Sequence, residues 1–372
     1  MDMSEHFTFS APGRVEISGN HTDHQHCCVL AAAIDMETRA DVVLNGTNRI
    51  RVFSEGFAPT DISLDDLSVH EEEKNSTAAL VRGTAKAFTE RGAEIRGFDA
   101  TVTSSVLPGS GLSSSAAFEV LMGRIINGLF FDNKADAVEV AQIGQYAENV
   151  YFGKPCGLMD QTASSVGGLV FIDFADPAAP VVERVPFDFA SSGYTLCTVD
   201  SGADHADLTS EYAAITSELK TLCRTMGREF LRDTDENEFY ARLPELRKAA
   251  GDRAVLRAIH VYDENKRVLA QAEAIRNGDF DTFLSYVNLS GQSSWDYLQN
   301  VIPRGYTEHQ EMAFAITLCK KLLGDNGAVR VHGGGFAGTC LAFVKNEALD
   351  GFVEGVEKVL GKGSCHVLHI CG

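Results

Sequence analysis

Residues 107–117 read Leu-Pro-Gly-Ser-Gly-Leu-Ser-Ser-Ser-Ala-Ala and constrain the fold more than any other stretch of this chain. An alternating apolar and polar run, residues 98–106, precedes them and predicts a strand. Residues 116–126 follow and predict a helix with an apolar face. A glycine-rich turn therefore opens onto a helix N-terminus, where unpaired N–H groups and the helix dipole favour an anion. A phosphate-binding loop and a simple capped helix both fit, whereas a Walker A loop would need a lysine after the glycines.

Size and composition indicate a two-domain globular protein. The chain has 372 residues, more than a single hydrophobic core usually supports. The net charge of −20 argues against a general nucleic-acid or membrane-surface binder. Residues 1–10 lack the basic and apolar regions of a signal peptide, and the apolar runs are too short to span a bilayer. The nine cysteines form no C-x-x-C pair, so we expect reduced thiols and a cytoplasmic location.

Strand and helix patterns alternate along the whole chain and predict an α+β protein. Asn45-Gly46 separates two strand-like runs, 38–44 and 49–53, and predicts a β-hairpin. The proline-bearing segment 176–180 is the best linker. We therefore expect an N-terminal domain at residues 1–175 and a C-terminal domain at residues 176–372.

A second glycine-rich loop, His332-Gly-Gly-Gly-Phe-Ala-Gly338, follows a predicted strand in the second half. Three consecutive glycines cost backbone entropy, and they usually mark a close approach to another group. A plain turn is the alternative interpretation.

Three charged residues have the chemistry of an active site. Arg14 follows Pro12-Gly13 at the end of a predicted strand, and Asp160 lies on a predicted short helix, residues 158–165. Glu148 stands twelve residues before Asp160, and a carboxylate near a serine-lined phosphate loop suits Mg²⁺, which takes hard oxygen ligands. Taken singly, each is better explained structurally: Arg14 as an exposed side chain, and Asp160 as a carboxylate that the helix dipole favours in a first turn. The structural interpretation is also the better one for Glu148 alone.

Two groups of histidines and cysteines invite a metal interpretation. The first comprises His21, His24, His26, Cys27 and Cys28. Its spacing is that of a loop or strand, whereas two imidazoles four residues apart on a helix would be a sharper zinc signal. The second comprises Cys365, His366, His369 and Cys371, for which a packed terminal strand is the better explanation.

Four segments occur together in an order that resembles the GHMP small-molecule kinases. Residues 11–23, with Ala-Pro-Gly-Arg-Val and Asn-His-Thr-Asp, resemble the galactokinase sugar signature. Residues 107–117 resemble the phosphate motif of the GHMP kinases. Residues 155–161, Pro-Cys-Gly-Leu-Met-Asp-Gln, resemble the galactokinase segment that bears the catalytic Asp, and residues 333–338 resemble the third GHMP motif. The likeness covers nearly the whole chain.

The resemblance implies a GHMP-kinase-like α+β architecture of two domains, with the active site between them. It implies ATP and Mg²⁺, and phosphorylation of a sugar at its anomeric hydroxyl. Asp160 matches the general base and Arg14 the cation near the sugar O1. Arg14 would lower the pKa of Asp160 by pairing and stabilise a developing alkoxide, and Asp160 would accept the O1 proton.

The remaining implied contacts fall into three sets. The ATP-binding set is Pro108, Gly109, Ser110, Gly111, Leu112, Ser113, Ser114 and Ser115. The magnesium ligands are Ser115, with Ser114 as the alternative, and Glu148. The sugar-binding set is Asn20, His21, Asp23, Cys156, Gly157, Tyr212, Gly334 and Gly335. The expected partners are a small-molecule sugar and ATP, and the expected oligomeric state is a monomer.

The sugar-binding segments depart from the family pattern. Asn20 stands where the family has a Glu that contacts the 6-hydroxyl, and His24 stands at the usual Tyr. Asp204 replaces a cation of the motif at residues 200–205. Two substrates stay open: galactose, and a C6-oxidised sugar such as galacturonate. A Glu would repel the carboxylate of galacturonate by roughly 1–4 kcal/mol, and Asn20 removes this repulsion.

A third hypothesis is a non-catalytic sugar sensor. The intact serine motif at residues 113–115 and the presence of Asp160 argue against it.

Overall fold

The computed structural model describes residues 5–106, 111–154, 156–203 and 208–371. The chain divides into two compact units, each of which is discontinuous in sequence. The first comprises Met1–Val15, Ala32–Gly168 and Cys371–Gly372, and the second comprises Glu16–Ala31 and Leu169–Ile370. The domain boundary expected after residue 175 stays a prediction, and the segment 16–31 belongs to the second unit.

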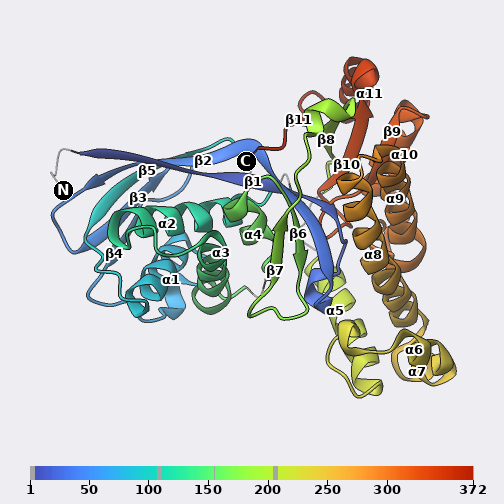
Figure 1. The fold of residues 1–372 in the computed structure, drawn as a ribbon, viewed down its shortest axis with the longest axis horizontal. Coiled ribbons are helices and arrows are strands. Elements are labelled where there is room, and N and C mark those ends of the chain that lie inside the picture. Colours follow the sequence, from blue (N-terminus) through green and yellow to red (C-terminus); the bar gives the residue numbers. More distant parts are fainter. Residues whose placement is uncertain (1–4, 107–110, 155, 204–207, 372) are drawn as a thin grey trace. The chain divides into compact units, whose positions relative to one another are not determined.

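In the first unit, α-helices pack on one face of a β-sheet (Figure 1). Its strands are β3 (Arg49–Ser54), β4 (Thr60–Ser63), β5 (Phe98–Ser104) and most of β1 (His6–Ser18) and β2 (Cys28–Leu44). Residues 16–18 of β1 and 28–31 of β2 belong to the second unit. Its helices are α1 (Thr77–Glu90), α2 (Ser114–Phe130), α3 (Ala137–Tyr146) and α4 (Met159–Val166), and the π-helical turn η3 (Ala147–Phe152) extends α3. The core between the sheet and the helices contains Val42, Phe88, Val102, Val120 and Ile125.

The β-hairpin predicted around Asn45-Gly46 is wrong. The strand order is β4-β3-β5-β2, with β1 also beside β2, so β5 lies between the two predicted partners. β5 pairs antiparallel with β2 and parallel with β3. The turn bonds to the start of β5, because Asn45 Nδ2 donates to Asp99 Oδ1 over 2.6 Å and Gly97 N donates to the Thr47 carbonyl over 3.0 Å. Tertiary pairing with a later strand therefore outweighs the local turn signal.

The second unit contains a four-stranded antiparallel sheet and a set of long helices. The strand order is β11-β8-β10-β9, with β8 (Tyr194–Asp200), β9 (Gly327–Val331), β10 (Thr339–Lys345) and β11 (Cys365–Leu368). In the same unit, β6 (Leu169–Asp173) pairs antiparallel with β7 (Val181–Arg184).

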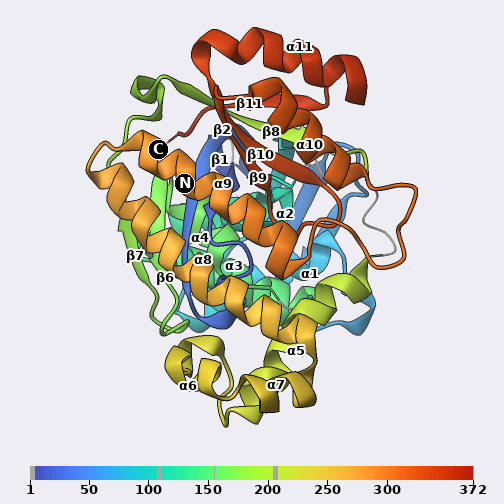
Figure 2. The same cartoon turned by 90° about the vertical axis from the view of Figure 1, so that its right-hand side faces the viewer.

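The helices of the second unit form two apolar clusters. One cluster lies among α5 (Thr209–Thr225), α6 (Glu236–Ala241), α7 (Leu243–Ala250) and α8 (Asp252–Arg276). The other joins the sheet to α10 (Glu311–Leu323) and α11 (Leu349–Leu360). α9 (Phe280–Ser293) runs beside α8 and ends in the π-helical turn η6 (Ser294–Leu298) (Figure 2).

All nine cysteines are free thiols, and most are buried in these cores. Cys365 faces a packed cluster on β11, as the terminal-strand interpretation predicted. Among the described residues, no helix is long and apolar enough to cross a membrane.

Candidate active site

Arg14 and Asp160 form a bidentate ion pair in the first unit. Arg14 lies in β1, and Asp160 lies in the first turn of α4. Arg14 Nε donates to Asp160 Oδ1 and Nη2 donates to Oδ2, each over 2.7 Å. The two side chains are 9% and 30% exposed, respectively, so part of the Asp160 side chain stays accessible. Two parallel charge-assisted bonds fix both its position and its orientation.

The glycine loop is tied directly to this pair. Ser113 Oγ donates to Asp160 Oδ2 over 2.7 Å, and Arg14 Nη1 donates to the Gly111 carbonyl over 2.6 Å. The backbone N–H of Arg14 donates to the Leu112 carbonyl over 3.0 Å. A Cβ on Gly13 would lie 3.0 Å from that same carbonyl oxygen, so a larger residue there would crowd the loop.

Opposing effects act on the pKa of Asp160. Burial raises the pKa, but the charge of Arg14 and the hydrogen bonds from Arg14 and Ser113 outweigh it and lower the pKa below the usual range. The carboxylate is therefore ionised at neutral pH.

The start of α2 has the features of an anion site. Ser113 is in the left-handed region, with φ of 57°, and its side chain does not cap the helix. Its hydroxyl donates to Asp160 instead, so the Ser113 side chain does not occupy the first N–H groups of α2. Pro108, Gly109 and Ser110 of the predicted phosphate loop lie outside the described residues.

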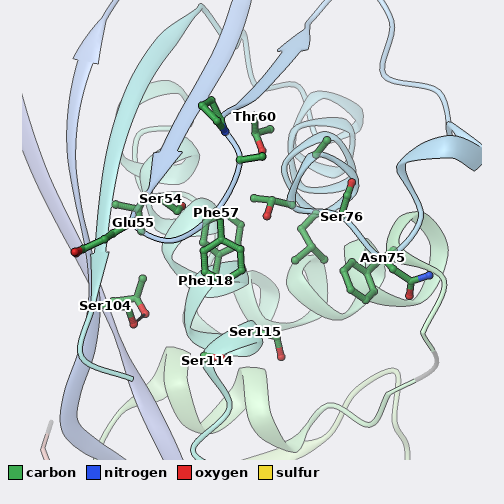
Figure 3. Close-up of a pocket in the computed structure, with 18 of the residues that line it drawn as sticks. Ser54, Glu55, Phe57, Thr60, Asn75, Ser76, Ser104, Ser114, Ser115 and Phe118 are labelled. Carbon is green, nitrogen blue, oxygen red and sulfur yellow. Dashed lines mark hydrogen bonds between the residues drawn. The ribbon is translucent and has the colours of Figure 1, made fainter. Parts of the chain in front are cut away.

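A cavity of about 910 Å³ lies in the first unit beside the start of α2. Figure 3 shows Ser114 and Ser115 at the start of this helix, and Phe57 and Phe118 among the other residues that line the cavity. Serine and threonine hydroxyls, Glu55 and the apolar faces of the phenylalanines line it. This volume and mixed lining are typical of a small-molecule site. The helical pattern of residues 116–126 includes Phe118, but no sequence pattern linked Phe118 with Phe57, because the cavity walls come from separate strands and helices.

Glu148 lies in η3 next to a second buried carboxyl group. Gln161 Nε2 donates to Glu148 Oε2 over 3.0 Å and to Glu119 Oε2 over 2.9 Å. Burial, together with the charge of Glu148, raises the pKa of Glu119 well above its usual range. Glu119 Oε1 has no hydrogen-bond partner in the part of the chain that the structure describes. Two adjacent carboxyl groups with an unsatisfied oxygen favour a nearby cation.

Cys156 uses both of its backbone groups within the first unit. Its N–H donates to Asn149 Oδ1 over 2.7 Å, and its carbonyl accepts from Gln145 Nε2 over 3.2 Å. Gly157 is exposed.

The predicted sugar residues 20–23 belong to the second unit, where Asn20 is completely buried. Its Nδ2 donates to Glu16 Oε1 over 3.0 Å and to the Gly333 carbonyl over 2.5 Å. Its Oδ1 accepts from Asn300 Nδ2 over 2.9 Å. The whole carboxamide is therefore used inside the protein.

His21 and His24 form an ordered chain of hydrogen bonds. His21 Nε2 lies 3.0 Å from the Gly334 carbonyl, which can only accept, so this nitrogen carries the proton. His21 Nδ1 then accepts from His24 Nε2 over 2.9 Å, and His24 Nδ1 accepts from Gln25 Nε2 over 3.2 Å. Burial lowers the pKa of His21 to about 3 and of His24 to about 4, so both rings are neutral.

Tyr212 packs against the glycine loop. Its hydroxyl donates to the Gly335 carbonyl over 2.8 Å, and a Cβ on Gly334 would lie 2.7 Å from its ring. With Asn20 and His21, this contact means that side chains hold three successive carbonyls of the loop. We refer to residues 333–335 as the triple-glycine loop.

Three polar residues of α8 hold the segment that contains Asn20, and the sequence analysis missed them. Gln271 Oε1 accepts from Ser18 Oγ, Glu264 Oε1 accepts from the Asn20 N–H over 3.2 Å, and His260 Nε2 donates to the Asn20 carbonyl over 3.0 Å. Burial raises the pKa of Glu264, but nearby Arg267 and His260 outweigh it and lower the pKa to about 2. The helical spacing of these residues on an otherwise apolar face is a signal that could have found them.

The other predicted residues of this segment make structural contacts. Asp23 begins the short 3-10 turn η1 (Asp23–Gln25) and is half-buried. His26 stacks on Phe230 with ring centroids 3.6 Å apart, and Cys28 Sγ accepts from Arg232 Nη1 over 3.7 Å. Among the described residues, no group of His, Cys, Asp and Glu has the arrangement of a metal site.

Two protein families match the chain. The GHMP kinases N terminal domain matches residues 79–168, and the galactokinase galactose-binding signature matches residues 2–42. The second match spans Arg14, Asn20, His21 and Asp23.

Relatives of known name match over nearly the full length. A galactokinase of Actinobacillus pleuropneumoniae serotype 5b (strain L20) is 31% identical over 381 residues, covering 99% of this chain and 95% of the relative. A galactokinase of Glaesserella parasuis serovar 5 (strain SH0165) is 32% identical, covering 92% and 86%.

Solved structures agree with the sequence matches. The galactokinase of Lactococcus lactis in complex with galactose superposes with a TM-score of 0.84 at 25% identity, covering 99% of this chain and 94% of that one. The mevalonate kinase of Methanococcus jannaschii, with a TM-score of 0.70 at 12% identity, shares the fold. The predicted α+β GHMP-kinase fold is confirmed. The chain is a sugar kinase with the GHMP fold and belongs to the galactokinase family.

Proposed function

We propose that this protein transfers the γ-phosphoryl group of ATP to the anomeric hydroxyl of galactose. The observation that carries the proposal is the Arg14–Asp160 pair, bonded to Ser113 beside an uncapped helix N-terminus. The full-length likeness to galactokinases, one of them solved with galactose, supports the choice of sugar.

Asp160 is the proposed general base. An ionised carboxylate offers about four acceptor sites, and Arg14 and Ser113 use three of them. The fourth site is left for a sugar hydroxyl. Because the pKa of Asp160 is low, it does not strip the hydroxyl proton in the ground state. It accepts the proton as the O1–phosphorus bond forms and the hydroxyl becomes acidic, which suits the loose transition state of phosphoryl transfer.

Arg14 has two proposed roles. It keeps Asp160 ionised and oriented, and its positive charge stabilises the negative charge that develops on O1. Both roles depend on a guanidinium, because a lysine ammonium cannot make the same fork of hydrogen bonds.

ATP is proposed to occupy the cavity that Phe57 and Phe118 line. The aromatic faces suit a base, and Ser114 and Ser115 bring the start of α2 to the phosphate end. This adds Phe57, Phe118 and their neighbours to the ATP-binding set expected from residues 108–115.

Mg²⁺ fits the oxygen donors of this unit. Glu148 and Ser115 would hold it. The Glu119 Oε1 near Glu148, unpaired among the described residues, supports this choice, although Lys154 Nζ already lies 3.6 Å from Glu148 Oε1. When bound, Mg²⁺ neutralises phosphate charge.

The proposed sugar contacts in the second unit are Asp23 and the triple-glycine loop. The backbone of Cys156 and Gly157 and the ring of Tyr212 complete the proposed set. The expected active site between the domains, the monomeric state and the cytoplasmic location stay predictions.

Steady-state kinetics on galactose, galacturonate, arabinose and N-acetylgalactosamine test the proposal. We expect the highest kcat/KM for galactose, with α-galactose 1-phosphate identified by ³¹P NMR. Fast turnover of galacturonate with negligible turnover of galactose would replace galactose by the C6-oxidised sugar. Full biological activity of Asp160→Ala without turnover would instead support the sensor hypothesis.

A further inference from the structure

Glu16 accepts hydrogen bonds from both Asn20 and the buried guanidinium of Arg330 in the second unit. Glu16 Oε1 accepts from Asn20 Nδ2 over 3.0 Å and from Arg330 Nη1 over 3.1 Å, and Arg330 Nη2 also donates to it. The side chains of Glu16 and Arg330 are only 6% and 1% exposed. This buried ion pair therefore relies on neutral donors such as the Asn20 amide to complete its hydrogen bonding.

The same amide group holds the triple-glycine loop. Asn20 Nδ2 donates one hydrogen to Glu16 and the other to the Gly333 carbonyl. Asn300 Nδ2 bonds both Asn20 Oδ1 and the Gly334 carbonyl, over 2.9 and 3.1 Å. A Cβ on Gly335 would lie 2.2 Å from the Asn300 carbonyl oxygen, so the loop has no room to shift toward this side.

We propose that Asn20 and Glu16 act as a coupled positioning pair, which sets the triple-glycine loop for the sugar, and that Asn20 does not itself contact the sugar C6 group. The effect on the sugar rests on the function proposed above, whereas the coupling of the two side chains does not.

The charge arrangement explains why the amide is required at position 20. A carboxylate there has no hydrogen to give, so it would face both the Glu16 carboxylate and the Gly333 carbonyl as a third acceptor. Two buried anions would then share Arg330. Neutralising Glu16 removes one anion and supplies a new amide donor, so the two substitutions compensate each other.

The test is a double-mutant cycle of Asn20→Asp, Glu16→Gln and the double variant. Asp matches Asn in size, so Asn20→Asp changes only charge and donor capacity. We expect each single variant to raise KM for galactose at least tenfold, while KM for ATP stays within about twofold. The double variant should have a KM at least tenfold below the product of the single effects, which corresponds to about 1.4 kcal/mol of coupling.

A second sugar separates positioning from direct contact. If Asn20 acts through the loop, Asn20→Asp raises KM for galactose and for 6-deoxygalactose by the same factor. If it contacts the 6-hydroxyl, galactose alone loses affinity, and the proposal fails.

Asn265→Asp is the matched control. Asn265 Oδ1 accepts from the Cys28 N–H over 2.9 Å, and an Asp can still accept there. We expect its kinetics and unfolding midpoint to match the wild type.

Thermal unfolding separates failure of this inference from failure of the proposed function. The unfolding midpoints of the cycle should show the same compensation even if galactose is not the substrate. The proposed coupling is wrong if the KM effects of the two single variants multiply in the double variant and their shifts of the unfolding midpoint add. It is also wrong if Asn20→Asp changes neither KM nor the unfolding midpoint.

Discussion

At the residue scale, Asp160 shows how three bonds set the behaviour of one carboxylate. Arg14 and Ser113 occupy one side of it and lower its pKa against the effect of burial. The same contacts leave 30% of the side chain exposed to a ligand. Charge and access are therefore set by the same neighbours.

Asp160→Asn tests the proposed base directly. The amide is isosteric but cannot accept a proton, so we expect kcat to fall about 10²- to 10⁴-fold with little change in the free energy of ATP binding. Rapid-quench measurement of sugar phosphate, with fluorescence titration of ATP, checks both quantities. A kcat within tenfold of the wild type would remove Asp160 from the role of base.

Arg14→Lys tests how the pKa of Asp160 is set. Lysine cannot make the bidentate pair, so the pKa of Asp160 should rise. Because the ionised form is the active one, activity is lost as pH falls through this pKa. A raised pKa therefore moves the acid limb of the kcat/KM profile to higher pH.

Arg39→Lys is the control for that profile. Arg39 pairs with Glu37 on the surface, with a side chain that is 59% exposed, and its substitution should leave the profile unchanged. An acid limb that stays in place in Arg14→Lys would show that a different group limits activity at low pH.

At the element scale, α3 and η3 carry Glu148 from a well-capped start. The Asp136 carboxylate accepts from the N–H groups of Val138 and Glu139, and Glu139 Oε2 accepts from the Asp136 N–H, each over 2.9 Å. This capping box fixes where the helix begins, and the π-helical turn that follows it contains Glu148.

Asp136→Ala should lower the free energy of unfolding by about 0.5–2 kcal/mol, because two N–H groups lose their acceptor. Urea denaturation measures the change. Asp136→Ser keeps a capping oxygen and should recover most of the loss. Equal losses in both variants would mean that the cap contributes little.

The triple-glycine loop depends on a backbone conformation that suits only glycine. Gly335 has φ of 78°, and its missing Cβ leaves space for the Asn300 carbonyl. Gly335→Ala should therefore lower the free energy of unfolding by roughly 1–3 kcal/mol and raise KM for galactose.

Gly351→Ala is the contrasting substitution. Gly351 lies in α11 with open space around its Cβ position, so alanine should raise the free energy of unfolding by about 0.5–1 kcal/mol. Similar effects at the two glycines would contradict the steric explanation.

At the scale of the whole molecule, buried neutral histidines make folding sensitive to acid. Burial lowers the pKa of His21 to about 3 and those of His24 and His260 to about 4, from a usual 6.5. All three lie in the network that holds the second unit around Asn20.

Stability should therefore fall as pH drops from about 6.5 to about 4. Above this range the three rings are neutral in both the folded and the unfolded chain. Within it, the unfolded chain binds the protons first, at about 1.4 kcal/mol per pH unit for each ring. His24→Gln should reduce the slope of unfolding free energy against pH by up to one proton. If His24→Gln leaves this slope unchanged, His24 is already protonated in the folded protein over this pH range, which would contradict the prediction.

Local patterns predicted much of this fold. Residues 98–104 of the predicted strand form β5, and the predicted helix at 116–126 lies within α2. Strand and helix periods reflect burial of one face, which neighbouring residues encode directly. The hairpin at Asn45-Gly46 failed because strand pairing depends on which later segment reaches the same sheet edge.

The candidate site was also only partly predictable from the sequence. The sequence by itself determined which residues are candidates for the proposed reaction, because Arg14, Asp160 and the serine loop lie in short contiguous motifs whose chemistry can be read directly. Only the tertiary structure decided what each side chain has left to offer a ligand. Asn20, the expected sugar contact, donates both amide hydrogens inside the protein, to Glu16 and to the Gly333 carbonyl. The cavity beside α2 is lined by residues from segments that are far apart in the sequence. Hydrogen-bond capacity is finite and burial is long-range, so both are settled only when distant parts of the chain meet.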